Sequence, residues 1–213
     1  RYYSFRTVLR LGQTGWQRRK IRIQNNEREV FFFSHPSMRY SDIEFEMADS
    51  HLLARHKEVR VDEEYENFLR SALADGKLLG LLLLFSFSSV LIELMNEMSF
   101  TVILSGESGA GKTTLASVAC SLFYPAAEET FTANSTAVGL ELAMKSMKNL
   151  PILLDEGALR KLNLQDIIFM VSAGKSKLRG TKHLTINLSS FSSVLFYTSE
   201  SSELSELSRG GAF

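Results

Sequence analysis

Cysteine is almost absent from the sequence: Cys120 is the single one among 213 residues. One cysteine excludes a disulfide framework and argues against a cysteine-based metal site. The four histidines, at positions 35, 51, 56 and 183, also lack the spacing of metal ligands, so we interpret them as ordinary surface or core residues. The scarcity of cysteine suits a reducing compartment, and we expect a cytoplasmic protein.

The sequence also lacks an excess of charge of either sign. Its 24 basic and 24 acidic residues give a formal net charge of zero. Overall charge therefore indicates no polyanionic partner, and any basic patch must be local. The hydrophobic share of 45% and the charged share of 23% are typical of a soluble globular protein.

No signal peptide is visible in the first ten residues, and no apolar run reaches the ~20 residues of a typical membrane-spanning helix. The longest apolar stretch, residues 78–95, is interrupted by Gly80 and three serines and contains Glu93. We interpret it as a buried helix or helix pair, with a membrane segment as the alternative. No membrane partner is expected.

The chain divides by composition into residues 1–76 and residues 77–213. Residues 1–34 alternate as strands do, with turns near Gly12 and Asn25, and are rich in arginine. These strands could contact DNA or present a solvated face. A helical pattern ends at Gly76. We predict a small β-rich N-terminal module with a helical end, followed by a core that Phe213 truncates. Since the first residue is Arg1, we expect a piece of a longer protein.

The core alternates apolar strands with helices, which predicts an α/β layer with a mostly parallel sheet. The strand at residues 100–104 precedes the sequence GESGAGKT, which satisfies the phosphate-binding pattern G-x-x-x-x-G-K-[ST] before a helix. Glycines let successive N–H groups turn toward phosphate oxygens, and the helix N-terminus favours anions. The residues expected to contact the nucleotide are Gly106, Ser108, Gly109, Ala110, Gly111, Lys112, Thr113 and Thr114.

Two carboxylates follow a second apolar strand, in the sequence ILLDE that ends at Asp155 and Glu156. We expect Lys112 to reach the β- and γ-phosphates, and Thr113 and Asp155 to hold Mg²⁺. Glu156 would be the general base that activates water. This pair of acids favours ATP hydrolysis over the chemistry of small-molecule kinases.

A basic turn and a fourth strand complete the core. Lys175, Lys177 and Arg179 are candidates for contact with DNA or with the nucleotide of a neighbouring subunit, although a solvated basic loop is the plain alternative. The strand at residues 194–197 ends in polar residues, of which Thr198 or Ser199 is the candidate sensor of the γ-phosphate.

These pieces together resemble the DUF927 family of phage, plasmid and mobile-element primase-helicases and self-loading helicases. The resemblance is carried by GESGAGKTTLASVACSLF, FTANSTAVGLELA, ILLDE, VSAGKSKLRG and VLFYTSE, and is clear over residues 78–213. It implies an AAA+/RecA-like P-loop NTPase core of the additional-strand type, with a parallel sheet flanked by helices. It also implies a homo-oligomer, expected to be a hexamer, that uses ATP and Mg²⁺ to unwind or move along single-stranded or forked DNA.

Two other functions stay open on the sequence. One is a P-loop kinase or phosphotransferase that acts on a small substrate. The other is a nucleotide-dependent assembly switch that hydrolyses slowly and moves nothing. The glycine loop alone fits all three.

Overall fold

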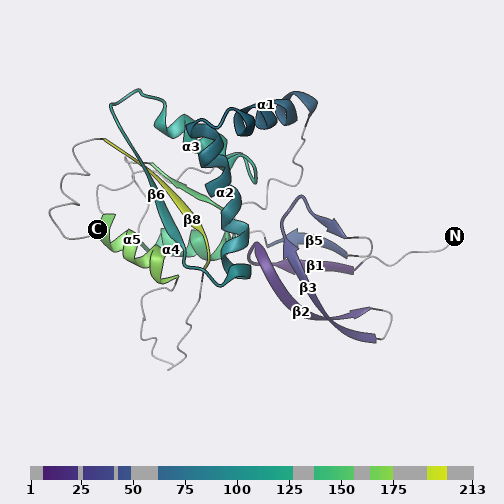
Figure 1. Ribbon diagram of the computed structural model, residues 1–213. Helices are drawn as coiled ribbons and strands as arrows, with labels where there is room; N and C mark the ends of the chain where they lie inside the picture. The colour runs from purple at the N-terminus through teal and green to yellow at the C-terminus, as the bar shows by residue number, and fades with distance from the viewer. Residues whose placement is uncertain are drawn as a thin grey trace.

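The computed structural model describes residues 7–23, 26–40, 43–48, 62–126, 137–155, 164–174 and 191–200. It is a mixed α/β structure, in which a group of strands at the N-terminal end lies beside a parallel sheet flanked by helices (Figure 1). The predicted α/β class is thereby confirmed. The sequence TFT at residues 130–132 also predicts a strand, which lies outside the described residues.

The N-terminal strands form two small sheets. Strands β2 (Gly15–Ile23) and β3 (Asn26–Ser34) make an antiparallel hairpin, while β1 (Thr7–Leu11), β5 (Ile43–Met47) and β4 (Arg39–Tyr40) form a second sheet. One face of the hairpin packs on that sheet through the buried side chains of Leu11, Phe32 and Met47. The first three strands match the prediction. Strands β4 and β5 were not predicted, although the alternation in β5 (IEFEM) is a strand signal.

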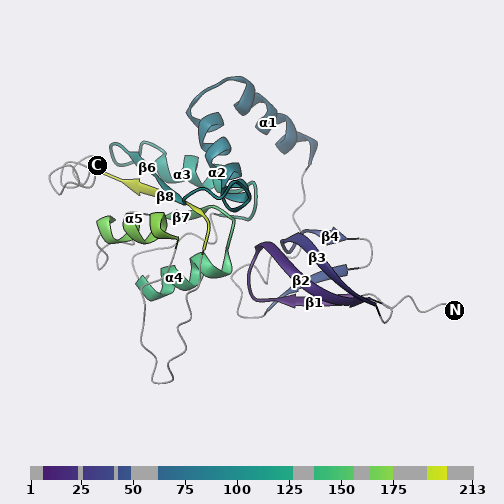
Figure 2. The same ribbon diagram turned by 60° about the horizontal axis from the view of Figure 1, so that its bottom comes forward.

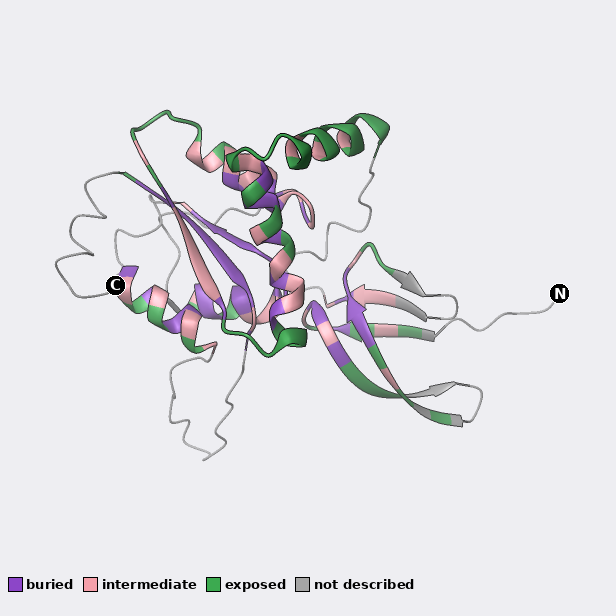
Figure 3. Cartoon of the chain, viewed as in Figure 1, coloured by how far each residue is buried: buried purple, intermediate pink, exposed green. Residues whose placement is uncertain are grey.

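The core sheet consists of β6 (Phe100–Ser105), β7 (Ile152–Leu154) and β8 (Val194–Ser199), all parallel. Their order in space is β6-β8-β7, so the last strand in the chain lies between the other two. Every residue of β8 is buried, as expected for a central parallel strand covered on both faces (Figure 3). All three were predicted from their apolar runs.

Helices cover both faces of this sheet, as Figure 2 shows: α2 (Leu78–Met95) and α3 (Lys112–Cys120) on one side, α4 (Ala137–Ser146) and α5 (Leu164–Ala173) on the other. Helix α1 (Glu63–Ala74) has no buried residue and packs on α2 where Gly80 passes close to the carbonyl of Ala72. The helix predicted to end near Gly76 is confirmed, and Gly76 takes positive φ there. The sequence LNLQDIIFMVSAG likewise predicts a helix that ends at Gly174, and α5 confirms it, with positive φ at Gly174.

Among the described residues, α2 is the one helix long and apolar enough to cross a membrane by length and composition. In the structure, six of its residues are buried against the core, including Leu82, Leu83 and Ile92. The predicted apolar helix is thus present as a single helix that is buried along one side only, since Leu81, Leu84 and Phe87 on α2 are about half exposed.

The N-terminal strands dock on the core through buried polar groups at the amino-terminal edge of the parallel sheet. Thr14, which is fully buried, donates its backbone N–H to Ser146 (2.8 Å) and its hydroxyl to the Lys148 carbonyl (2.9 Å). The Trp16 backbone N–H donates to Asn149 Oδ1 (3.0 Å), and its indole N–H to the Val90 carbonyl (2.9 Å).

A second contact lies between the end of β3 and the end of α3. His35, 6% exposed, bonds through Nε2 to the Phe123 carbonyl at 2.8 Å and through Nδ1 to Ser37 Oγ at 2.6 Å. Because buried polar groups are costly without partners, these bonds fix how the N-terminal strands sit on the core.

Candidate functional site

The glycine loop, residues 106–111, connects the end of β6 to the start of α3. Gly109 and Gly111 have φ of 78° and 81°, in the left-handed region that only glycine enters at little cost. A Cβ at either position would meet nothing within 4 Å, so the backbone conformation, and not crowding, explains the glycines. No side chain caps the N-terminus of α3, so its first N–H groups are available to an anion.

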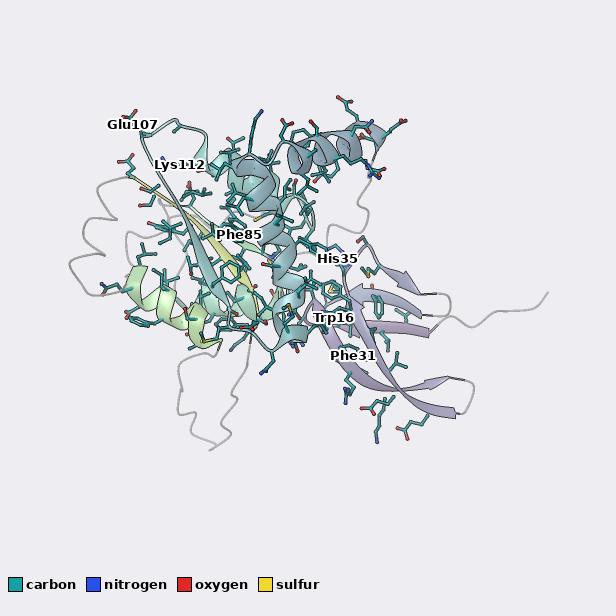
Figure 4. The ribbon with its side chains drawn as sticks, viewed as in Figure 1. Trp16, Phe31, His35, Phe85, Glu107 and Lys112 are labelled. Atoms are coloured by element: carbon teal, nitrogen blue, oxygen red, sulfur yellow. The ribbon has the colours of Figure 1, made fainter. Side chains whose placement is uncertain are left out.

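Lys112, the first residue of α3, folds back along the glycine loop (Figure 4). Its Nζ donates to the carbonyls of Gly106 (2.8 Å) and Glu107 (2.7 Å). An ammonium group has three donors, so one is left for a further acceptor. Residues 107–111 and Thr114 are exposed, which leaves this side of the loop open to a ligand.

Asp155 follows β7 and joins three segments that are far apart in the chain. Its Oδ1 accepts a hydrogen bond from the Thr113 hydroxyl in the first turn of α3, at 3.0 Å. The same oxygen accepts one from the Thr198 hydroxyl in β8, at 2.5 Å. The sheet thus brings three predicted site residues to one point at its carboxyl-terminal edge, where ligands bind in open α/β sheets.

Thr198 and Ser199 were equal candidates from the sequence, and the structure separates them. Successive side chains of a strand point to opposite faces. Thr198, 1% exposed, faces Asp155, whereas the Ser199 hydroxyl donates to the neighbouring Glu200 carbonyl at 2.9 Å. The Ser199 carbonyl accepts the Gly106 N–H at 3.3 Å, so β8 also supports the start of the glycine loop.

Comparison with known proteins gives a family for this chain. Residues 44–189 match the family model described as Domain of unknown function (DUF927). The chain belongs to the DUF927 family. No curated protein matches it. The resemblance seen in the sequence is confirmed, with different limits: the match begins inside β5 and ends before β8, so Asp155 lies within it and Thr198 beyond it.

Four predicted site residues of this DUF927 chain lie outside the described residues. They are the proposed general base Glu156 and the basic residues Lys175, Lys177 and Arg179. Their roles remain predictions.

Within the part of the DUF927 chain that the structure describes, no group of three or more His, Cys, Asp or Glu side chains could hold a metal ion. Magnesium does not require one, because it is commonly bound through one or two carboxylates together with substrate phosphates and waters. The Asp155 carboxylate and the Thr113 hydroxyl have the hard oxygen ligands that Mg²⁺ prefers, and Lys112 has the charge to balance phosphate. These residues fit a magnesium–phosphate group.

Cys120 is the last residue of α3 and is fully buried. The sequence predicts no role for it, and its burial argues against a catalytic role. Burial raises the pKa of its thiol from 9.0 to about 12, although a hydrogen bond with Tyr124 opposes the rise. A thiol needs its thiolate form to act as a nucleophile. Cys120 is therefore a core residue of the DUF927 chain and not a reactive one.

Proposed function

We propose that this DUF927 chain is a magnesium-dependent ATPase with a P-loop core of the additional-strand type. The observation that carries the proposal is the pair of hydroxyl groups, from Thr113 and Thr198, that donate to one oxygen of Asp155 at 3.0 and 2.5 Å. A glycine loop alone indicates phosphate binding. When the loop is also joined to Asp155 at the end of β7 and to Thr198 at the end of β8, the arrangement favours hydrolysis of a bound phosphate group.

The strand order supports the additional-strand type. In such a core, one strand is inserted between the strand that precedes the phosphate loop and the strand that bears the magnesium aspartate. Here β8 lies between β6 and β7. The inserted strand brings Thr198 next to Asp155, and this polar strand end is what favours hydrolysis over a kinase or phosphotransferase.

Each side chain then has a role that follows from its position. Lys112 keeps two bonds to the loop and directs its third donor to a phosphate oxygen. Thr113 and Asp155 hold the magnesium ion, which when bound would neutralise charge on the β- and γ-phosphates. Thr198 fixes the orientation of the Asp155 carboxylate and donates toward the γ-phosphate. Glu156, one residue further on, accepts the proton of the attacking water.

We propose that hydrolysis is coupled to unwinding of, or translocation along, single-stranded or forked DNA by a hexamer of this chain. Membership of the DUF927 family, with the resemblance to mobile-element helicases, is the support for this step. The basic residues Lys175, Lys177 and Arg179 are the proposed contacts with DNA or with a neighbouring subunit's ATP.

The test is phosphate release and the binding of a fluorescent ATP analogue by the whole chain with Mg²⁺. Lys112→Ala should abolish both, whereas Lys77→Ala, which removes the same charge from the exposed N-cap of α2, should change neither. Phosphate release without an added acceptor separates an ATPase from a kinase. If the chain binds no ATP analogue, or if Lys112→Ala binds it as well as the parent does, the proposal is wrong.

The coupling to DNA is tested separately with Glu156→Gln. For a motor, this variant should still bind ATP but lose turnover and unwinding. Single-stranded or forked DNA should raise the turnover of the parent chain. If DNA leaves ATP turnover unchanged, and if Glu156→Gln stays permanently in its ATP-bound oligomeric state, the chain is a nucleotide-dependent switch.

A further inference from the structure

The hairpin β2–β3 has two faces of opposite character. Residues directly opposite in an antiparallel pair share a face, so Trp16, Arg18 and Lys20 share one with Phe33, Phe31 and Glu29. The other face, which includes Phe32 and Val30, packs on the small sheet of β1, β5 and β4. The first face therefore points away from the core of the N-terminal strands.

Phe31 is an exposed aromatic ring on that outward face. Its ring lies 5.1 Å from the Trp16 ring at an interplanar angle of 12°, and Phe33 meets Trp16 edge-on at 5.2 Å. Trp16 is held by its bonds to Asn149 and Val90, so Phe31 rests on a fixed support. Yet 53% of Phe31 is exposed, so another flat ring can reach the part of its surface that Trp16 and Arg18 leave uncovered.

Positive charge gathers around the same ring. The Arg18 guanidinium carbon lies over the Phe31 ring, 5.9 Å from its centroid, and both Arg18 and Lys20 are exposed on this face. The strand register places Arg18, Lys20 and Arg22 on this face together with Glu27 and Glu29, a net charge of +1 (3 − 2) within a chain of net charge zero. Glu29 lies 3.9 Å from Arg18, but exposed ion pairs of this kind contribute little and do not remove the local excess.

We propose that this outward face of β2–β3 binds single-stranded DNA by stacking an unpaired base on Phe31 while Arg18 and Lys20 contact the phosphates. Stacking on aromatic side chains beside basic residues is how proteins hold single strands without reading their sequence. The inference rests on the proposed function, since it names a surface that meets the DNA. Figure 4 shows Trp16 and Phe31 far from Glu107 and Lys112, so the two sites can be tested separately.

An unpaired base with a phosphate on either side fits better than an acidic protein segment. A carboxylate-rich peptide would satisfy Arg18 and Lys20 but would offer nothing flat to the exposed ring of Phe31. A base in a closed duplex is stacked on its neighbours and cannot reach the ring. The face therefore favours single strands over duplexes and over acidic peptides.

The experiment measures binding of a fluorescent single-stranded oligonucleotide to the whole chain, without ATP, by anisotropy. Phe31→Leu keeps an apolar contact with Trp16 but removes the aromatic face, and it should weaken binding about 5- to 140-fold, the effect of losing one stacked base. Phe31→Tyr keeps the ring and should stay within about twofold of the parent. Phe169→Leu removes a ring that is 65% exposed on α5 and should have no effect.

Charge and position are separated by a second pair of variants. Arg18→Gln, beside Phe31, should weaken binding and reduce the slope of log affinity against log salt by about one. Arg19→Gln removes the same charge from the other face of the hairpin. It should change the affinity and the salt slope less than Arg18→Gln does. Trp16 is the single tryptophan and stacks on Phe31. Its fluorescence should fall when a base stacks on Phe31, whereas a merely structural role for Phe31 would leave the fluorescence unchanged.

Three results would overturn the inference. They are equal affinity of Phe31→Leu and Phe31→Tyr, equal competition by a blunt duplex, and equal competition by polyglutamate, which would make the face a site for acidic proteins. Lys112→Ala should bind the oligonucleotide as the parent does. If the chain hydrolyses no ATP while Phe31→Leu still weakens DNA binding, the proposed ATPase activity is wrong and the proposed DNA-binding surface is supported.

Discussion

Gly15→Ala should disrupt the junction between the N-terminal strands and the core. Gly15 starts β2 with φ of 92°, and a Cβ there would lie 2.3 Å from Asn149 Oδ1 and 2.6 Å from the Lys148 carbonyl oxygen. These two oxygens accept the bonds from Trp16 N–H and the Thr14 hydroxyl. Alanine therefore cannot fit unless the docking contact opens.

The expected cost has three parts. A non-glycine residue at positive φ costs about 1–3 kcal/mol, overpacking at the junction about 1–3 kcal/mol, and the loss of one docking hydrogen bond about 1 kcal/mol. The sum, roughly 3–7 kcal/mol, is a large share of the ~5–15 kcal/mol that stabilises a typical folded protein. At about 2–4 °C per kcal/mol for a chain of this size, the melting temperature should fall by roughly 6–28 °C.

Gly12→Ala is the matched control for this change. Gly12 lies in the same turn, but its Cβ would meet nothing within 4 Å and its φ is not in the left-handed region. Alanine there should be neutral or stabilise slightly, by up to ~1 kcal/mol, because it restricts the unfolded chain.

Thermal unfolding followed by circular dichroism and by the emission of Trp16 compares the two variants. The dichroism reports global stability, and the tryptophan reports the junction, since its indole N–H is bound to Val90. If Gly15→Ala melted within about 2 °C of Gly12→Ala with unchanged emission, the docking described here would be wrong.

Three further predictions follow from the core. The Cβ of alanine at position 80 would lie 2.6 Å from the Ala72 carbonyl oxygen. Gly80→Ala should therefore lower the urea midpoint of unfolding by the equivalent of about 1–3 kcal/mol. An unchanged midpoint would contradict the close packing of α1 on α2. Thr198→Val removes one of the two hydrogen bonds to Asp155. It should slow phosphate release at least tenfold, equivalent to about 1.4 kcal/mol or more, while the affinity for the ATP analogue changes less. Equal turnover would show that this hydroxyl is dispensable. Cys120 should react with a thiol reagent at pH 8 only as fast as the chain opens, and ATP with Mg²⁺ should slow the reaction by linkage. Its folded pKa, about 12, exceeds 9.0, so its contribution to stability is present below pH 9 and is lost as pH rises toward 12. Between pH 9 and 12, the stability of Cys120→Ala should therefore fall less steeply than that of the parent chain.

The sequence could predict the glycine loop and the acidic strand end because both follow from local chemistry. The positive φ of Gly109 and Gly111 favours glycine whatever surrounds them, and an apolar run that ends in Asp155 indicates a buried strand with a polar end. The short, continuous apolar runs of β6, β7 and β8 similarly indicate buried parallel strands. These signals lie within a few residues, so they can be read without knowing the fold.

Other features depend on contacts between distant residues and could not be predicted. Nothing local to β8 says that it pairs with both β6 and β7. The choice between Thr198 and Ser199 depends on which face of β8 is turned to Asp155, and a shift of one residue reverses that face. The docking of Thr14 on Lys148 joins residues 134 positions apart. Strand β5 was not predicted, although the alternation of its sequence IEFEM is a local strand signal.

The positions of the two proposed sites explain how they could be coupled. Strand β7 has three residues, and it separates Asn149, which accepts a bond from Trp16, from Asp155, which accepts bonds from Thr113 and Thr198. At about 3.3 Å per residue, the six residues from Asn149 to Asp155 span no more than ~20 Å.

The amino-terminal ends of the strands are also bonded to one another. The Asn149 N–H donates to the Ser192 carbonyl at 2.6 Å, and the Ser193 hydroxyl donates to the Leu150 carbonyl at 2.5 Å. Strands β7 and β8 are buried along their length, and close-packed interiors transmit displacement more readily than they absorb it. In the proposed ATPase, strand β7 is therefore the shortest covalent connection between Asp155 and Asn149, the residue that accepts the Trp16 N–H.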